Sequence, residues 1–546
     1  MLGLHPMIQL LMPEITLVLG ATLILLTGLS KELSRRAALF SLATIGVALW
    51  FAFRASAGEI DTSGVTALHD GPLVWFARTI TLAVGALIVM VNRHVPDEGE
   101  RAEFFALLMF SLAGVSLVPM ANSLVMLFLA LELVSVPTYI LIGLSRRDIH
   151  AQESAGKYFF LGAFAAAITL YGFSFLYGFA GTMTLFGPDS IAVKFHDLGG
   201  MRDKLALFGL LLSIAGLGLK VAAVPFHFYV ADVYQGAASP VTGLLGFVPK
   251  FAGFLALINI LTLTGWTFGN AIFWLLWILA ALTMTVGNTL ALMQHNVKRM
   301  LAYSSVAHSG YMLVALAAGP KLFSGGREPL RDGIAALLFY MAAYGVMNLG
   351  CFAAFSFFRK PGDDDPDDSI ETLDELAGSA REHPWATLGL ALCVLGLMGF
   401  PLTGGFIGKF YIISSALSAD GAAPAFANVS AHSGAMLALV IILALNAAVA
   451  AAYYLRILAA CYLRKPTAGV TPSRCHALQL SLAICAILAV AIFIRPGVLY
   501  SYSRGAAQAV ASTAIAPAAV ATGDVAPTAS PAEKSAPVMS MTQVGE

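Results

Sequence analysis

Long apolar runs separated by short polar segments fill most of this chain of 546 residues. A helix of about 20 apolar residues spans the hydrocarbon core of a bilayer, so each run predicts one transmembrane helix. The pattern therefore predicts an all-α polytopic membrane protein of about fourteen transmembrane helices. The predicted helices lie near residues 8–29, 37–54, 73–92, 103–119, 122–144, 153–179, 205–224, 240–263, 270–293, 300–318, 332–357, 384–418, 433–462 and 477–495.

Two of the predicted helices contain helix-breaking residues. Pro225 interrupts the seventh, and the short segment FYVADVYQGAA follows it. The twelfth carries Gly399, Pro401, Gly404 and Gly405 within seven residues. Lipid cannot satisfy the backbone groups that such a break frees, so protein or internal water must do so. Discontinuous helices of this kind are typical of transporters and mark the ion path.

The two discontinuous helices are five helices apart, which suggests an internal repeat of helices 4–8 and 9–13. Because five is odd, the second unit is expected to be inverted in the membrane relative to the first. The tail is rich in Ala, Pro, Thr and Ser and is expected to be disordered. The expected divisions are helices 1–3 at 1–102, the first repeat at 103–263, the inverted repeat at 270–462, helix 14 at 475–495 and the tail at 505–546.

The composition agrees with a membrane protein and excludes several other classes. The chain is 58% hydrophobic and only 11% charged, whereas a soluble domain is about 25% charged. Lys plus Arg equals Asp plus Glu, and no basic run occurs, so nothing indicates nucleic-acid binding. The five cysteines form no CxxC pair, which favours small core residues over a disulfide or metal framework. The N-terminus lacks a basic segment before its apolar run and predicts a first transmembrane helix.

The distribution of loop charges predicts the orientation. Loops on one side of the predicted membrane hold about twice as many lysines and arginines as those on the other side. The positive-inside rule then places both termini on the outer side. The acidic stretch 361–375 falls in an inner loop and is expected to be a solvated surface.

Four ionisable residues lie deep inside predicted helices: Glu132, Lys220, Lys250 and Lys409. A charge at the bilayer centre costs about 2.5–3.5 kcal/mol on insertion scales. A membrane protein tolerates such charges when they pair with each other or reach internal water, and they are the usual parts of proton or ion pathways. The four residues therefore indicate a path for a proton or another ion.

Glu132 and Lys220 are the natural ion pair among these groups. Each lies five residues before a proline, and pairing would offset much of the cost of burying both charges. A purely structural salt bridge is the alternative. Lys250 and Lys409 have no carboxylate in their own segments, so each is a plausible proton carrier. Snorkelling of the side chain to the membrane interface is the alternative for both.

Four further residues are candidates for the same path. His227 follows the break in the seventh helix and His308 lies within SSVAHSGYMLVAL, where an imidazole can relay protons or be an ordinary hydrogen-bonded interior group. Lys157, early in the sixth helix, could approach the predicted ion pair or lie at the inner interface. Tyr303 and the two serines after it could line a hydrated path or join helices.

No motif indicates a cofactor on this chain. Neither histidine has a metal-ligand partner at helical spacing, so metal binding is not expected. The sequence contains no nucleotide-binding loop, no cysteine cluster for iron–sulfur, no bis-histidine pattern for haem and no catalytic triad. The chain is expected to move an ion without holding a redox centre.

Four stretches carry a family resemblance: LFLALELVSVPTYILIGL, GLKVAAVPFHFYVADVYQGAASPVTGLLGFVPK, NVKRMLAYSSVAHSGYML and GFPLTGGFIGKFY. In them the chain resembles the antiporter-like membrane subunits of respiratory complex I, the NADH–quinone oxidoreductase. Among these the resemblance favours the subunit N family, because a lysine stands at position 409 and the chain is of modest length. The resemblance extends to about residue 495 and leaves out the tail.

The resemblance implies both a fold and roles for individual residues. It implies fourteen helices with two inverted five-helix repeats, in which Glu132 and Lys220 form the pair. Lys250 matches the central lysine of the family, and Lys409 matches the lysine that leads to the opposite face. Other polar positions of interest in the family fall at Lys157, His227 and Tyr303.

The implied function is a proton-translocating subunit, without redox chemistry of its own, that couples quinone reduction to pumping. NADH, FMN, iron–sulfur clusters and quinone would bind to other subunits. The implied partners are the other membrane subunits of complex I, including neighbouring antiporter-like subunits, in a bacterial inner membrane. A subunit of an Mrp-type cation/proton antiporter and a membrane hydrogenase subunit are the alternatives. A third alternative is a scaffold without a conducting path. The four deep charges and the two broken helices argue against it.

Overall fold

Helices make up nearly all the regular structure in the residues that the computed structural model describes, which are 6–56, 68–95, 97, 99–266, 270–320, 332–359, 370–418, 432–466 and 470–522. The first helices are α1 (Pro6–Leu10), α2 (Met12–Thr27), α3 (Lys31–Ser34), α4 (Ala37–Ser56) and α5 (Pro72–Asn92). The predicted first repeat contains α6 (Arg101–Leu117), the 3-10 turn η1 (Val118–Met120), α7 (Leu124–Ser145), α8 (Ile149–Ala180), α9 (Ile191–Asp197), α10 (Lys204–Lys220), α11 (Val230–Gly236) and α12 (Ser239–Thr262).

The remaining elements follow the same alternation of long helices and short connections. The predicted second repeat contains α13 (Asn270–Leu292), α14 (Val297–Ala318), α15 (Gly333–Phe357), α16 (Ser379–Glu382), α17 (Pro384–Met398), α18 (Gly404–Leu417) and α19 (Ser433–Leu463). The chain closes with α20 (His476–Ile494) and α21 (Pro496–Thr522). A two-stranded antiparallel pair joins β1 (Phe358–Arg359) to β2 (Thr471–Pro472).

The predicted membrane architecture is confirmed. Within the described ranges, 11 helices are long and apolar enough to cross a membrane. The other three predicted spans correspond to the shorter helix α2, to α10 with α11, and to α17 with α18. The protein is therefore an all-α polytopic membrane protein.

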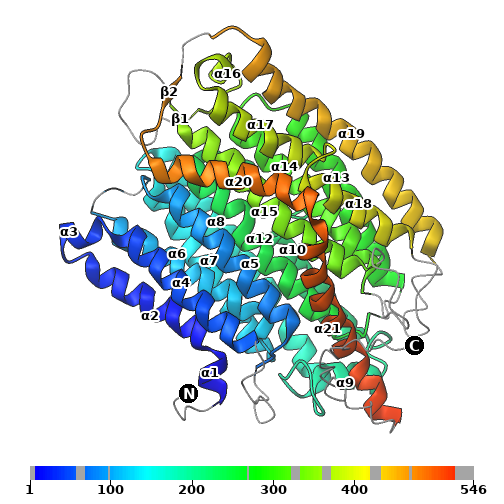
Figure 1. Ribbon diagram of the computed structural model, residues 1–546. Coiled ribbons are helices and arrows are strands. Elements are labelled where there is room, and N and C mark those ends of the chain that lie inside the picture. The colour runs from blue at the N-terminus through cyan, green and yellow to red at the C-terminus, as the bar shows by residue number, and fades with distance from the viewer. Residues whose placement is uncertain are drawn as a thin grey trace, which may run out of the picture.

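The helices form one bundle, in which α2 and α4 lie at one edge and α19 at the opposite edge (Figure 1). Helices α12 and α15 pack against each other, and their membrane-crossing windows are completely buried. Helix α14 is almost as buried and packs on both of them. A helix that is apolar on all sides belongs in a core, which is where these three lie. Lys250 and His308 are thereby carried into the centre of the protein.

Both predicted breaks are confirmed. The segment 221–229 separates α10 from α11, and the segment 399–403 separates α17 from α18. Each break contains a residue other than glycine in the left-handed region, Ala222 with φ 58° and Leu402 with φ 75°. Such residues are rare and cluster at functional sites. The division into two inverted repeats stays a prediction, although α6 packs on α7 as α13 packs on α14.

Gly399 shows why the second break needs glycine. It ends α17 with φ +82°, a conformation that favours glycine. A Cβ at this position would also lie 2.9 Å from Cδ of Lys409, so the missing side chain leaves room for the lysine.

The expectation of a disordered tail from residue 505 is wrong for the part up to Thr522. This part belongs to α21, which packs against α5 and α15. Small side chains on one face of the helix allow this close contact; the small or short buried residues after Tyr500 are Ser503, Ala506, Ala507, Val510, Ala511 and Ala514. Residues 523–546 lie outside the described residues, as do residues 361–369 of the predicted acidic loop.

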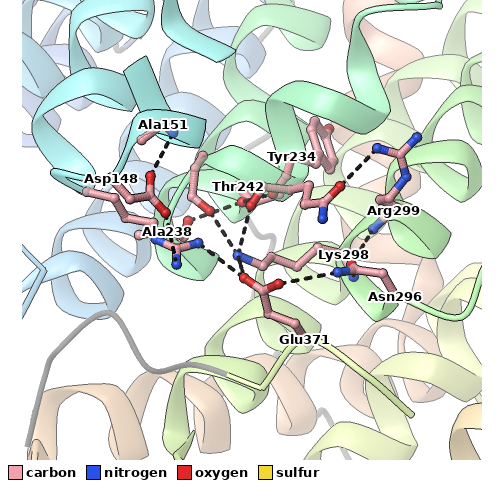
Figure 2. A network of polar contacts seen from close by, with 12 residues as sticks. Asp148, Ala151, Tyr234, Ala238, Thr242, Asn296, Lys298, Arg299 and Glu371 are labelled. Atoms are coloured by element: carbon pink, nitrogen blue, oxygen red, sulfur yellow. Dashed lines mark hydrogen bonds and ion pairs between the residues drawn. The ribbon is translucent and has the colours of Figure 1, made fainter. Parts of the chain in front are cut away.

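A cluster of ion pairs ties several helix ends together at one end of the bundle (Figure 2). We call it the Lys298 network. The Lys298 side chain is fully buried; its ammonium group donates to the backbone oxygens of Gln235 (3.2 Å) and Ala237 (3.1 Å) and lies 3.1 Å from Oε1 of Glu371. Glu371 also accepts from Arg146 at the end of α7, at 3.1 Å. One carboxylate therefore compensates two cations from two different helices.

The same network extends to the second half of the first broken helix. Arg299 donates to Oδ1 of Asp232 on α11 at 2.8 Å, and Lys157 on α8 lies 3.2 Å from Oδ2 of the same carboxylate. The Lys298 network therefore fixes α11 against α8 and α14. It also holds the end of α7 and the segment that leads into α12, the helices that carry Glu132 and Lys250.

Replacing Glu371 by Gln is expected to destabilise the protein, because Lys298 would keep a buried charge without its carboxylate. Loss of one partner of a buried ion pair costs about 3–5 kcal/mol, and the lower end applies because Glu371 is partly exposed. The thermal unfolding midpoint in detergent measures the effect. The control is Asp374→Asn, which breaks an exposed pair with Arg464 (2.6 Å) and is expected to change the midpoint little. Equal effects of the two changes would contradict this account.

The pH dependence of the Glu371→Gln effect has a defined sign. Burial raises the pKa of Glu371, but the ion pairs with Lys298 and Arg146 outweigh burial and hold the pKa below its ordinary value. The contribution of the Glu371 carboxylate to stability is therefore fully present above the ordinary glutamate pKa of about 4.3. It is lost as the pH falls through the lower pKa that Glu371 has in the folded protein. The difference in thermal unfolding midpoint between wild type and Glu371→Gln should become smaller below about pH 4.

Candidate functional site

The predicted pair of Glu132 and Lys220 is present. The Lys220 ammonium lies 3.1 Å from Oε1 of Glu132 on α7 and donates to Oγ of Ser135 at 2.6 Å. The lysine side chain is 8% exposed and the glutamate side chain 23%. Lys220 is the last residue of α10, where the unpaired carbonyl groups of a helix C-terminus favour a cation. Ser135, one turn after Glu132, is a partner that the sequence analysis did not identify.

Lys250 has hydroxyl and carbonyl partners in place of a carboxylate. Its ammonium donates to Oγ of Ser305 and Oγ of Ser309, both at 3.0 Å, and to the backbone oxygen of Ser305. An ammonium has three donors, and α14 satisfies all three. The side chain is buried at 4% exposure, so it does not snorkel. Pro249 directly precedes it and removes one backbone N–H from α12.

A small cavity is lined by both Lys220 and Lys250. Its volume is about 10 Å³, roughly the space that one water molecule needs. Three tyrosines line it together with the two lysines; they are Tyr158, Tyr229 and Tyr234. The hydroxyl of Tyr234 accepts from Ser305 at 3.3 Å, and Ser305 is a partner of Lys250. Hydroxyl groups therefore reach from the wall of this cavity to the Lys250 ammonium.

Lys409 folds back into the break between α17 and α18. Its ammonium donates to the backbone oxygens of Leu397 (3.0 Å) and Met398 (2.8 Å), which are C-terminal carbonyl groups of α17. It also lies 5.0 Å from the ring centroid of Tyr311, close enough for a cation–π contact. The lysine is 6% exposed, so the snorkelling alternative does not describe this side chain.

His308 lies on α14 near both lysines. Its Nδ1 is 2.6 Å from the hydroxyl of Tyr340 and its Nε2 is 2.9 Å from the hydroxyl of Tyr454. Tyr454 also shares a hydrogen bond with Ser304. His308 is thus a hydrogen-bonded interior histidine, beside the serines that hold Lys250. Neither tyrosine could be predicted from the sequence as a partner of His308, because a tyrosine inside an apolar run gives no signal of its partner.

Three candidates from the sequence lie outside this buried set. Lys157 is 43% exposed and pairs with Glu153 and Asp232, which fits the alternative of an interface lysine better than an approach to the Glu132–Lys220 pair. The rings of His227 and Tyr303 lie beside the first break, with centroids 6.5 Å apart and planes tilted by 59°, and both residues are partly exposed. Within the described chain, no hydrogen bond joins either ring to a buried lysine.

The comparisons with known proteins agree with this arrangement. The family model described as NADH:quinone oxidoreductase/Mrp antiporter, TM, matches residues 121–461, which include the whole buried set. The chain is 34% identical over 468 residues to NADH-quinone oxidoreductase subunit N of Trichlorobacter lovleyi, covering 84% of this chain and 88% of that protein.

Solved structures show the same fold. A chain of respiratory complex I from Thermus thermophilus with bound aureothin is 27% identical, with a TM-score of 0.71, and the match covers 90% of this chain and 100% of that one. A chain of the Mrp complex from Dietzia is 19% identical with a TM-score of 0.75, over 93% and 99% of the two chains, which shows a shared fold only. The chain therefore belongs to the NADH:quinone oxidoreductase/Mrp antiporter transmembrane family, and within it to the NADH-quinone oxidoreductase subunit N proteins.

Proposed function

We propose that this chain is a proton-translocating membrane subunit of an NADH:quinone oxidoreductase, complex I, and couples quinone reduction to proton pumping. The observation that carries the proposal is the set of buried ionisable groups from Glu132 through Lys220 and Lys250 to Lys409. Each member has protein partners at hydrogen-bonding distance, and the first and last lysines lie at the two helix breaks. Such groups inside a membrane protein are the usual parts of proton paths.

The first step concerns the ion pair. Quinone reduction elsewhere in the complex weakens the contact between Glu132 and Lys220. Separation removes the carboxylate that favours the charged form of Lys220, so the lysine gives up its proton more readily. The proton moves through the small cavity, by one water molecule or a tyrosine hydroxyl, to Lys250.

The second step carries a proton from Lys250 towards Lys409. The hydroxyl groups of Ser305 and Ser309 contact the Lys250 ammonium, and His308 lies on the same helix within electrostatic reach of both lysines. Lys409 then releases the proton on the outer side. Re-formation of the Glu132–Lys220 pair resets the path, which is reloaded from the inner side.

The redox chemistry belongs to other subunits in this proposal. NADH, FMN, the iron–sulfur clusters and quinone would bind there, and this chain would contribute proton movement alone. Its partners would be the neighbouring membrane subunits, including other antiporter-like ones. Lys157, His227 and Tyr303 stay outside the proposed path, because within the described residues no hydrogen bond or ion pair joins any of them to its buried members.

The proposed location is a bacterial inner membrane with both termini on the outer side. The loop charges support this orientation. Figure 1 adds that α1 and the last turns of α21 lie at the same end of the bundle, with α16 and the β1–β2 pair at the other end. Alkaline phosphatase, which folds only outside the inner membrane, is expected to be active when fused after Glu546 and inactive when inserted at 361–369. The reverse pattern would contradict the orientation.

A subunit of an Mrp-type cation/proton antiporter is the second candidate, supported by the shared fold with the Dietzia Mrp chain. A membrane hydrogenase subunit is another alternative. In either of these proteins the same buried groups would move protons, but a different reaction would drive the movement.

Lys220→Ala is expected to abolish coupled turnover. In inverted membrane vesicles, NADH-driven acidification and quinone reduction should both fall roughly tenfold or more while the complex stays assembled. The matched control is Lys204→Ala, which removes an exposed lysine from the first position of the same helix and should behave like wild type.

Two other results would overturn the proposal. Normal acidification and normal quinone reduction in assembled Lys220→Ala complexes would exclude Lys220 from the path. If both activities are normal and the strain loses sodium tolerance, the antiporter function replaces the one proposed.

A further inference from the structure

We infer that Tyr340 and Tyr454 relay protons to and from His308, and so complete the link between Lys250 and Lys409. This inference rests on the proposed function, because it concerns the same proton path. It assigns roles to two hydroxyl groups that come from helices α15 and α19, on either side of α14.

The first observation is that both ring nitrogens of His308 are engaged by tyrosine hydroxyls. Tyr340 lies 2.6 Å from Nδ1 and Tyr454 lies 2.9 Å from Nε2. All three side chains are buried, with exposures of 1% or less for His308 and Tyr340. A neutral imidazole donates through one nitrogen and accepts through the other. The two tyrosines must therefore take opposite roles, one as donor to the ring and one as acceptor from it.

Because one tyrosine donates to the imidazole and the other accepts from it, a proton can pass through the three groups from the donating to the accepting tyrosine. When the donating tyrosine passes its proton to the bare nitrogen, an N–H bond forms there and the O–H bond breaks. The opposite N–H bond then breaks, and its proton moves to the accepting tyrosine. A proton taken up by the first tyrosine and one released by the second restore the neutral groups. One proton enters, one leaves, and the imidazole tautomer is exchanged.

The second observation is that each tyrosine contacts a residue that is next in sequence to a different lysine site. Tyr454 hydrogen-bonds to Ser304, the residue before Ser305, which holds the Lys250 ammonium. Tyr340 packs against α18 at Gly408, directly before Lys409; a Cβ on that glycine would lie only 2.4 Å from Cδ2 of the Tyr340 ring. The relay therefore extends from the Lys250 side through His308 to the Lys409 side.

The test is removal of each hydroxyl with the ring retained, in Tyr340→Phe and Tyr454→Phe. In assembled complexes, NADH-driven acidification of vesicles should fall roughly tenfold or more. The ratio of rates in H₂O and D₂O should rise, because proton transfer across the interrupted relay becomes limiting.

The matched control is Tyr344→Phe. Tyr344 lies on the same helix as Tyr340, is equally buried, and its ring also contacts His308, at a centroid distance of 4.9 Å. Its hydroxyl donates to Oδ1 of Asn348 at 3.4 Å, and within the described residues no hydrogen bond joins it to the imidazole. Acidification and the isotope ratio should stay at wild-type values in this control. An equal loss in all three variants would assign the effect to packing and overturn the relay.

A second measurement covers the case in which the Phe variants fail to assemble. Site-specific 3-fluorotyrosine at position 454 keeps the ring and the hydroxyl, but its phenol loses the proton more readily. A relay predicts that the alkaline limb of the pH–rate profile moves to lower pH. An unchanged profile would overturn the relay.

The outcomes separate this inference from the proposed function. If Lys220→Ala abolishes acidification while both Phe variants pump normally with a wild-type isotope ratio, the relay is wrong and the proposed function stands. If Lys220→Ala also pumps normally, the proposed function fails and the relay fails with it.

Discussion

The need to satisfy a buried ammonium group within the membrane governs this structure. Lys250 lies on α12, whose membrane-crossing window is completely enclosed, and neither lipid nor bulk water can solvate its charge there. Helix α14 supplies all of its partners through Ser305 and Ser309. The close packing of α12, α14 and α15 follows from this requirement as much as from apolar burial. An ammonium held by hydroxyls and a carbonyl, without a carboxylate, has no fixed counter-charge to retain its proton.

The two helix breaks stabilise the buried charges of Lys220 and Lys409 in different ways. Lys220 ends α10 and pairs with a carboxylate, so its charge is compensated outright. Lys409 reaches back to the carbonyl groups at the end of α17, which carry only a partial negative charge. The compensation of charge therefore decreases from Lys220 to Lys409. The Lys298 network holds the first arrangement in place from outside the buried set, because its ion pairs bind α11 and the end of α7.

Local sequence signals predicted a large part of this site. Lone charges inside apolar runs identified Glu132, Lys220, Lys250 and Lys409. A single proline located the first break, and a cluster of glycine and proline located the second. The partners could not be predicted, because Tyr454 meets His308 across 146 positions and periodicity carries no information on such a contact. The tail was mistaken for disorder because Ala and Ser also suit a closely packed helix such as α21. The pairing of Lys157 with Asp232 could not be predicted either, because Asp232 lies far along the chain.

The most direct test of the central claim is the number of protons moved per NADH oxidised in vesicles that carry Lys250→Met. Methionine keeps most of the side-chain length and removes the exchangeable proton. If protons pass through this central lysine, the assembled complex should move fewer protons for each NADH than wild type. An unchanged ratio at an unchanged turnover rate would contradict the account, because the buried set would then be structural.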